Sequence, residues 1–391
     1  MYKINYLNKI AQAGLSRFTE NYSFVEDYRE ANGLLVRSAS LHELELSAGI
    51  EAIARAGAGV NNIPLEKCAE RGIVVFNTPG ANANGVKELV IAAMIVAGRN
   101  LLDGSNWVTS CQREPEIAQL VEKNKSKFAG TEIKGKKLGV IGLGAIGALV
   151  ANAGIKLEMS VYGYDPYLSV EHAWKLSKHI RPIKSLEEIY RECDFITIHV
   201  PLMDATKGLI DEAAIEQMKT GVIFLNFSRD TLVDEAAVLG ALKTGIIAKY
   251  ITDFPNPQIC GRDNVITFPH LGASTAEAEE NCAVMAVEQL MDYLENGNIK
   301  NSVNYPSCDL GICQKAARLA INHKNIPNML GQLTGVLAGA NVNISDLVNK
   351  SRGAWAYTLI DLEAALDAKT IKELKEISGV LRVRVLKPLS V

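Results

Sequence analysis

Two residues far apart in the chain could carry out acid–base chemistry on a small acid. His270 follows an apolar run that ends in Phe268-Pro269, and an imidazole there can take up a proton near neutral pH. Arg229 follows another apolar run, and a guanidinium can hold a carboxylate through two parallel hydrogen bonds. The pair therefore predicts proton transfer on a substrate that carries a carboxylate. The alternatives are a core histidine with satisfied hydrogen bonds and a surface arginine paired with Asp230.

A glycine-rich turn gives a second signal, for binding a dinucleotide. A Gly-x-Gly-x-x-Gly pattern separates a strand-like run from a helical run, and Asp165 follows 18 residues after the last glycine. The helix dipole and the free N–H groups of the first turn favour a pyrophosphate. Asp165 would accept hydrogen bonds from both ribose hydroxyls and would repel a 2′-phosphate, which favours NAD over NADP. The residues expected at the pyrophosphate are Gly142, Gly144, Ala145, Ile146 and Gly147.

Two other polar residues end predicted strands. His199, in the segment His199-Val-Pro201, is expected to line the cofactor, with a purely structural role as the alternative. Asp253 ends another strand-like run, where its carboxylate could accept a hydrogen bond from the nicotinamide carboxamide.

A parallel sheet has to position all of these residues. The middle of the chain alternates short apolar runs with helical patterns, as in right-handed β-α-β crossovers. The predicted strands are Lys137–Gly142, Ser160–Asp165, Asp194–His199, Gly221–Asn226, Ile247–Asp253 and Val265–Pro269. The predicted helices between them are Ile146–Met159, Leu186–Glu192, Asp211–Met218 and Asp234–Lys243. The sequence therefore predicts a Rossmann-type domain.

Two further domains are expected around this one. The first 90 residues show a shorter alternation, with strands at Gly33–Val36, Ala52–Arg55 and Gly72–Phe76. A helix from Ser274 to about Asn296, with a capping box formed by Ser274 and Glu277, would lead the chain back to that flavodoxin-like, discontinuous domain. We expect residues 1–90 with 281–305 in the first domain, 91–280 in the NAD-binding domain, and 316–391 in a ferredoxin-like βαββαβ domain.

The bulk composition argues against several partner classes. The chain has 391 residues, 48% of them hydrophobic, and a formal net charge of −3, which gives no reason to expect nucleic acid or a membrane surface as partner. The first residues have no basic segment followed by a long apolar run, so we expect no secretory signal, and the longest apolar run, Leu89–Ala97, is too short to span a bilayer. The seven cysteines include no Cys-x-x-Cys pair, which favours reduced thiols and no metal site. A cytoplasmic protein is expected.

In combination, these motifs make the chain resemble the D-isomer-specific 2-hydroxyacid dehydrogenases, above all the D-3-phosphoglycerate dehydrogenases with a C-terminal ACT domain. The likeness covers nearly the whole chain. It rests on Leu35–Ser38, Gly57–Pro64, Asn77–Glu88, Gly142–Gly147, His199–Pro201, Asn226–Glu235 and Pro269–Thr275.

The resemblance implies a reaction and a role for each residue. The reaction is oxidation of 3-phosphoglycerate to 3-phosphohydroxypyruvate, with Arg229 on the substrate carboxylate and His270 exchanging the proton. Further substrate contacts would come from Arg37, Ser38, Asn61 and Asn82. Further cofactor contacts would come from Val200, Pro201, Phe227, Ser228, Gly272 and Ala273.

One departure from the family concerns the histidine. The family places a glutamate four or five residues after the aspartate that matches Asp253, and that carboxylate raises the pKa of the histidine. This chain has Pro257 and Gln258 there. A histidine without such a partner titrates near ~6.5, so we expect a pH–rate profile without the raised limb, unless another carboxylate substitutes.

The C-terminal unit implies a regulator, and other functions stay open. By resemblance, L-serine would bind at a dimer interface of a homodimer or homotetramer, near His323, Asn325 and Asn343; the alternative is a dimerisation unit without a ligand. The same chemistry on hydroxypyruvate, glyoxylate or lactate is a second reading of the enzyme. A third is an NAD-sensing regulatory protein.

Overall fold

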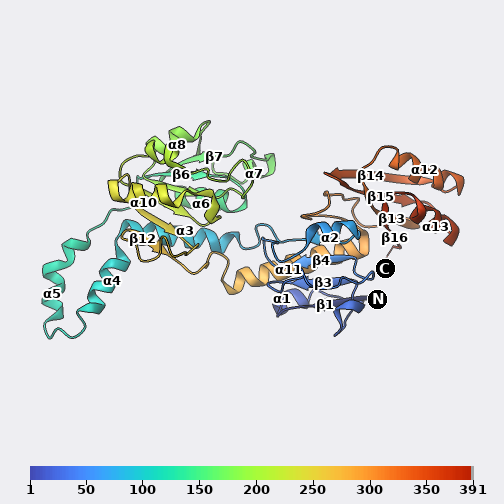
Figure 1. The fold of residues 1–391 in the computed structure, drawn as a ribbon, viewed down its shortest axis with the longest axis horizontal. Coiled ribbons are helices and arrows are strands. Elements are labelled where there is room, and N and C mark those ends of the chain that lie inside the picture. Colours follow the sequence, from blue (N-terminus) through green and yellow to red (C-terminus); the bar gives the residue numbers. More distant parts are fainter. Residues whose placement is uncertain (389–391) are drawn as a thin grey trace. The chain divides into compact units, whose positions relative to one another are not determined.

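The structure is a computed structural model that describes residues 1–388, apart from the side chain of Glu171, and it divides into two compact units (Figure 1). The central unit is Ala83–Ala278. The outer unit joins Met1–Asn82 to the described residues from Glu279 onward. Among residues 1–388, no helix is both long and apolar enough to cross a membrane.

The central unit is built on a seven-stranded parallel sheet in the order β12-β11-β10-β9-β6-β7-β8. The strands are β6 (Lys137–Ile141), β7 (Ser160–Tyr164), β8 (Arg181–Pro182), β9 (Phe195–Ile198), β10 (Val222–Asn226), β11 (Ile247–Thr252) and β12 (Val265–Thr267). The order of addition reverses between β6 and β9, and ligands of doubly wound sheets bind at the carboxyl ends of strands beside such a reversal. The predicted Rossmann-type sheet is confirmed, and β8 is an additional strand.

Helices cover both faces of this sheet because its strands are apolar on both sides. Ile223 and Leu225 face a core shared with α3 and α6, whereas Val222 and Phe224 face a core shared with α8, α9 and α10. The helices of this unit are α3 (Ala83–Gly98), α4 (Leu101–Ser110), α5 (Ile117–Asn124), α6 (Ala145–Lys156), α7 (Val170–Trp174), α8 (Leu186–Glu192), α9 (Glu212–Glu216) and α10 (Glu235–Thr244), with short 3₁₀ turns η2 (Lys125–Phe128) and η3 (Asp230–Leu232).

Helix α11 (Ala276–Asn296) begins at the end of the central unit and continues into the outer one. The predicted capping box at Ser274 is wrong. The hydroxyl of Thr275 accepts the N–H of Ala278 over 3.1 Å, so Thr275 caps the helix, and the Ser274 hydroxyl instead donates to the carbonyl oxygen of His270.

The outer unit contains a five-stranded parallel sheet in the order β2-β1-β3-β4-β5. Its strands are β1 (Tyr2–Tyr6), β2 (Tyr22–Phe24), β3 (Gly33–Val36), β4 (Ala52–Arg55) and β5 (Val74–Phe76). Its short helices are α1 (Gln12–Leu15), η1 (Tyr28–Glu30) and α2 (Leu65–Glu70). The buried face of α11, including Val287, Leu290 and Leu294, packs on one side of this sheet.

The same unit ends in a four-stranded antiparallel sheet in the order β14-β15-β13-β16. Its elements are β13 (Ala317–Lys324), α12 (Met329–Gly339), β14 (Ile344–Arg352), β15 (Trp355–Leu362), α13 (Ala368–Glu376) and β16 (Val380–Leu386). This is the predicted βαββαβ order, and it is drawn in red in Figure 1. The helices supply Leu333, Leu337 and Leu374 to its core.

A buried arginine attaches this C-terminal sheet to the parallel sheet of the same unit. The guanidinium of Arg384 lies 2.6 Å from the Glu51 carboxylate and 4.4 Å from the ring centre of Tyr293. It also donates to the carbonyl oxygens of Tyr293 and Leu294, at 3.0 and 2.7 Å. Removing one partner of a buried ion pair costs about 3–5 kcal/mol because the other charge is left buried and unpaired, so loss of either Arg384 or Glu51 would destabilise this unit.

Candidate active site

The glycine-rich turn lies at the carboxyl end of β6, and its three glycines differ in what an added Cβ atom would contact. Gly142 has φ +89°, and a Cβ there would come within 2.7 Å of the His199 carbonyl oxygen. A Cβ on Gly147 would overlap the carbonyl oxygen of Gly142. A Cβ on Gly144 would meet nothing within 4 Å. The turn therefore leaves open space beside the first N–H groups of α6, at Ala145 and Ile146, which fits a pyrophosphate.

Asp165 is held at this turn by backbone amides. Its Oδ2 accepts the N–H of Leu143 and its Oδ1 accepts the N–H of Tyr167, each over 2.9 Å. A carboxylate has about four acceptor positions, so two directions remain for hydroxyl donors. This geometry fits a ribose diol next to the pyrophosphate.

His199 follows β9 on the other side of the sheet reversal. Its Nε2 lies 2.9 Å from the Thr197 hydroxyl, and its Nδ1 is buried without a partner among the described residues. Burial lowers the pKa of His199 to about 3. The ring is therefore neutral at physiological pH, and one nitrogen is left for a further contact. Of the next two residues, Val200 is partly exposed and Pro201 is exposed.

Arg229 lies in the turn after β10, and a residue missed in the sequence analysis shapes that turn. The buried Asn226 side chain donates to the Arg229 carbonyl oxygen over 2.8 Å and accepts the Ser228 N–H over 3.1 Å. The Arg229 Nη1 donates to the Ser228 carbonyl oxygen over 2.6 Å. Asp230 instead accepts its neighbour's N–H, and the described structure has no ion pair between it and Arg229. The exposed guanidinium is available for an anion.

His270 and Asp253 meet at the end of the sheet. The His270 N–H donates to the carbonyl oxygens of Asp253 and Phe268, at 3.1 and 3.0 Å, and its φ is +51°, which is unusual for a non-glycine residue. The imidazole is exposed and lies edge-on to the Phe254 ring, with centroids 5.1 Å apart. Such backbone strain is typical of functional positions.

The Asp253 side chain is a buried carboxylate at the end of β11. It is 2% exposed; its Oδ2 accepts the Gly272 N–H over 3.1 Å, and its Oδ1 has no partner among the described residues. Burial raises the pKa of Asp253, while the Gly272 N–H and then the charges of His270 and Arg229 lower it. Arg229, Asp253 and His270 follow the ends of three neighbouring parallel strands, which fits a shared reaction centre.

The loop that lacks the glutamate is closed by a different pair. The Asn256 amide donates to both oxygens of Glu235 over 2.8 Å, and its Oδ1 accepts the Gln258 N–H over 2.9 Å. Glu235 is thereby engaged in holding the loop after β11. The remaining predicted cofactor residues lie nearby in sequence and structure: Phe227 and Ser228 are buried beside Asn226, and Gly272 and Ala273 follow His270.

The outer unit carries the predicted substrate residues after β3 and β4. The Asn8 side chain, another residue missed in the sequence analysis, accepts the N–H groups of Arg37, Ser38 and Ala39 at 3.3, 3.1 and 2.8 Å. It fixes the turn that presents Arg37 and Ser38. The Arg37 guanidinium is half-exposed and bonds the Glu279 carboxylate over 2.5 Å. An anionic substrate would have to compete with Glu279 for Arg37.

The other two substrate candidates lie in loops of the same unit. Asn61 is exposed, and its carbonyl oxygen contacts His42 Nε2 over 2.9 Å. Asn82 is partly exposed immediately before α3. Their side chains have no hydrogen bond recorded among the described residues, which leaves them able to bind a polar ligand.

The three effector candidates differ in accessibility. The His323 ring is buried; its Nδ1 lies 2.8 Å from the Lys324 carbonyl oxygen and its Nε2 lies 2.8 Å from the Thr358 hydroxyl. Both ring nitrogens are thus occupied within the fold. Asn325 and Asn343 are exposed, and their amides donate to the Gly353 carbonyl oxygen and to Glu363, respectively.

No cluster of three or more His, Cys, Asp or Glu side chains in the part of the chain that the structure describes could hold a metal ion. All seven cysteines are unpaired in the structure, and five of them are buried. Burial raises the pKa of the thiols of Cys68, Cys193 and Cys308 to about 12.

Known proteins resemble this chain over most of its length. A family profile described as D-isomer specific 2-hydroxyacid dehydrogenase, NAD binding domain, matches residues 91–272. The D-3-phosphoglycerate dehydrogenase of Haemophilus influenzae is 35% identical over 339 residues, which cover 84% of this chain and 79% of that one. The protein of the same name from Methanocaldococcus jannaschii is 32% identical over 355 residues, covering 88% and 64%. The chain thus spans most of the first relative and a little less than two thirds of the second.

Solved structures of dehydrogenases also resemble this chain. The NAD⁺-bound 3-phosphoglycerate dehydrogenase of Entamoeba histolytica is 28% identical with a TM-score of 0.59, over 78% of this chain and 98% of that one. A D-2-hydroxyisocaproate dehydrogenase has a TM-score of 0.63 at 22% identity, covering 78% and 100%, and shares the fold.

Proposed function

Because the chain belongs to the D-isomer specific 2-hydroxyacid dehydrogenase family, we propose that it oxidises 3-phospho-D-glycerate to 3-phosphohydroxypyruvate, with NAD as the cofactor. One observation carries the proposal: Arg229, Asp253 and His270 follow the carboxyl ends of three neighbouring parallel strands, β10, β11 and β12. The names of the curated relatives supply the substrate.

Each residue of the site has a separate role in the proposed reaction. The turn Gly142–Gly147 and Asp165 would hold NAD, which would supply a hydride acceptor for the carbon that carries the hydroxyl group. Arg229 holds the substrate carboxylate, and the neutral His270 imidazole takes the hydroxyl proton as that bond breaks. Arg37, Ser38, Asn61 and Asn82 bind the phosphate end. In the reverse direction, protonated His270 returns the proton.

An absorbance assay for NADH tests the proposal. NADH should form with 3-phospho-D-glycerate, and much more slowly with D-lactate or D-glycerate, which lack the phosphate. Equal turnover of the unphosphorylated acids would favour another D-2-hydroxy acid as substrate. NAD binding without turnover of any acid would favour an NAD-sensing protein. Arg229→Gln and His270→Gln should each lower kcat/KM by at least a hundredfold.

We further propose that L-serine binds to the C-terminal sheet and inhibits the enzyme. The exposed Asn325 and Asn343 supply polar groups for an amino acid, whereas the buried His323 ring acts only by supporting the strand. Calorimetry with L-serine is the test. Intact dimers that release no heat would make the C-terminal sheet a dimerisation unit without a ligand.

A homodimer or homotetramer in the cytoplasm completes the proposal. Helices α4 and α5 contain no buried residue within the described chain, and Leu101, Leu102 and Val108 expose large apolar surfaces there. Such a surface favours a subunit contact. Light scattering should give at least twice the 42.4 kDa of the chain, and Leu102→Lys with Val108→Lys should lower that mass. Seven unpaired cysteines suit a reducing compartment.

A further inference from the structure

The turn between β14 and β15 is bonded to the effector candidate Asn325. The Asn325 side-chain amide donates to the Gly353 carbonyl oxygen over 3.1 Å, and its backbone N–H donates to the Ala354 carbonyl oxygen over 2.9 Å. The Asn325 side chain is exposed. The carboxylate of an amino acid is a stronger acceptor than a neutral carbonyl group, so a ligand that bonds this amide would weaken its hold on the turn.

The same turn is bonded to a second segment of the outer unit. Arg352 is the last residue of β14, and its Nη1 donates to the Ser302 carbonyl oxygen over 2.9 Å. The Arg352 side chain is exposed, whereas Ser302 is buried. A change in the turn would therefore be passed on, through Arg352, to a buried part of the chain.

That buried part lies beside the start of a substrate loop. Ser302 forms an isolated antiparallel bridge with Phe76, the last residue of β5. The next residue, Asn77, donates its N–H to the Asn301 carbonyl oxygen over 3.4 Å. Asn77 begins the loop that ends at the substrate candidate Asn82. A hydrogen-bonded path within one compact unit thus leads from the effector candidate to the substrate loop.

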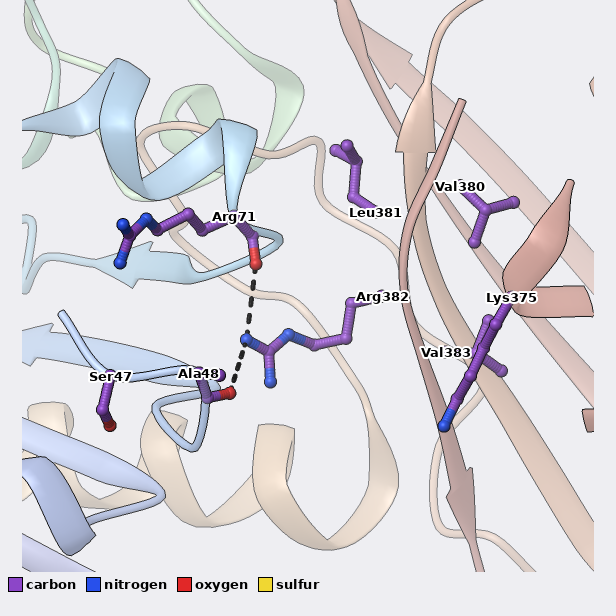
Figure 2. Close-up of a pocket in the computed structure, with 8 residues that line it drawn as sticks. All are labelled: Ser47, Ala48, Arg71, Lys375, Val380, Leu381, Arg382 and Val383. Carbon is purple, nitrogen blue, oxygen red and sulfur yellow. Dashed lines mark hydrogen bonds between the residues drawn. The ribbon is translucent and has the colours of Figure 1, made fainter. Parts of the chain in front are cut away.

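The opposite edge of the C-terminal sheet is fixed to the parallel sheet. Figure 2 shows the Arg382 guanidinium of β16 bonded to the carbonyl oxygens of Ala48 and Arg71, at 3.2 and 3.3 Å. The ion pair of Arg384 holds the same strand. Because β14 and β16 are the two outer strands of this sheet, a movement of the whole sheet would break these contacts. A ligand at Asn325 should therefore act locally, on the turn after β14.

We propose that Arg352 transmits the binding of L-serine at Asn325 to the loop after β5, a route that rests on the inhibition by L-serine proposed above. Arg352 is a positioning residue, since it touches neither ligand. Because the loop carries Asn82 at the phosphate end of the substrate, L-serine should raise the KM for 3-phospho-D-glycerate and leave kcat nearly unchanged. By linkage, the substrate should weaken the binding of L-serine by the same factor.

Calorimetric titration of the full chain with L-serine, with and without saturating 3-phospho-D-glycerate and in the absence of NAD, measures this coupling. The substrate should raise the Kd of L-serine by about fivefold or more in the unaltered chain. In Arg352→Gln it should raise that Kd by less than about twofold, while the Kd of L-serine alone is unchanged. Arg352→Lys keeps a cationic donor and should keep part of the coupling.

Lys350→Gln is the matched control. Lys350 is also an exposed cation on the same face of β14, and its loss should leave the coupling complete. Because Arg352 is exposed, thermal unfolding of its variants should match that of the unaltered chain.

Three results would count against this route. Equal coupling in Arg352→Gln and the unaltered chain would overturn the role of Arg352 and leave inhibition by L-serine in place. Inhibition that lowers kcat at constant KM would remove the loop after β5 as the receiver. No binding of L-serine to the unaltered chain would overturn both the route and the inhibition.

Discussion

The backbone N–H of His270 donates a hydrogen bond to the carbonyl oxygen of Asp253 over 3.1 Å. This contact joins the loops that follow β11 and β12, and it places the candidate base next to a buried carboxylate with one unpartnered oxygen. The family's glutamate is absent from the same loop.

Asp253→Asn should shift the pH dependence of oxidation. Oxidation needs the neutral imidazole, so the rate rises with pH. The substitution removes a negative charge from beside the imidazole, so the half-maximal pH of the oxidation rate should fall. Steady-state rates between about pH 5 and pH 9 measure this, and Asp253→Glu should restore most of the original profile. If only the KM for NAD changes, Asp253 binds the cofactor and does not act on His270.

Pro257→Glu is the complementary change. It returns a glutamate to the position from which the family's carboxylate acts on the histidine, so the half-maximal pH should rise. Gln258→Asn, a neutral substitution in the same loop, is the control and should leave the profile in place. An unchanged profile in Pro257→Glu would contradict the argument about the missing partner.

Glu279→Gln should improve binding of the phosphorylated substrate. Arg37 bonds Glu279 in the structure, and removal of that negative charge frees the guanidinium for the substrate phosphate. The KM for 3-phospho-D-glycerate should fall several-fold with little change in kcat, whereas Arg37→Ala should raise it. A KM that rises in Glu279→Gln would mean that Glu279 positions Arg37 for the substrate.

Two glycine substitutions in the turn after β6 should have different effects, one on NAD binding and the other on folding stability. Gly144→Ala places its methyl group in open space, so thermal stability should be kept while NAD binding weakens. Gly147→Ala forces a methyl group onto the Gly142 carbonyl oxygen and should cost more than about 2 kcal/mol of folding free energy. Thermal unfolding and NAD titration separate the two effects. Normal NAD affinity in folded Gly144→Ala would remove the pyrophosphate from this turn.

His199→Gln should make the free energy of unfolding depend less on pH under acidic conditions. The unfolded histidine binds a proton below about pH 6.5, while the folded ring stays neutral down to about pH 3. The unfolded state therefore binds more protons in this window, and stability falls as the pH is lowered through it, by roughly 1.4 kcal/mol per unit. Urea unfolding at several pH values without NAD should show a smaller slope for the variant; parallel curves would contradict the assignment.

The sequence allowed much of this site to be predicted because its signals are local. The glycines after β6 and the polar residues after β10 and β12 each follow an apolar run that predicts a strand, and their residue types are typical of turns. Asn8 and Asn226 could not be found in that way, because each acts on backbone groups that only the folded turns bring near. The two-residue strand β8 contains a proline and has no apolar run of its own.

The contact of Arg384 with Glu51 has the same character, since 333 positions separate the two residues and nothing in either neighbourhood indicates the pairing. The pairing has a consequence for any shortened form of the chain. A chain shortened to end near Tyr305 would leave the Glu51 carboxylate without its cation and bare the apolar face that Tyr357 and Leu359 now cover. The C-terminal sheet is thus part of the scaffold of this unit, and it cannot be removed or replaced without rebuilding the parallel sheet beside it.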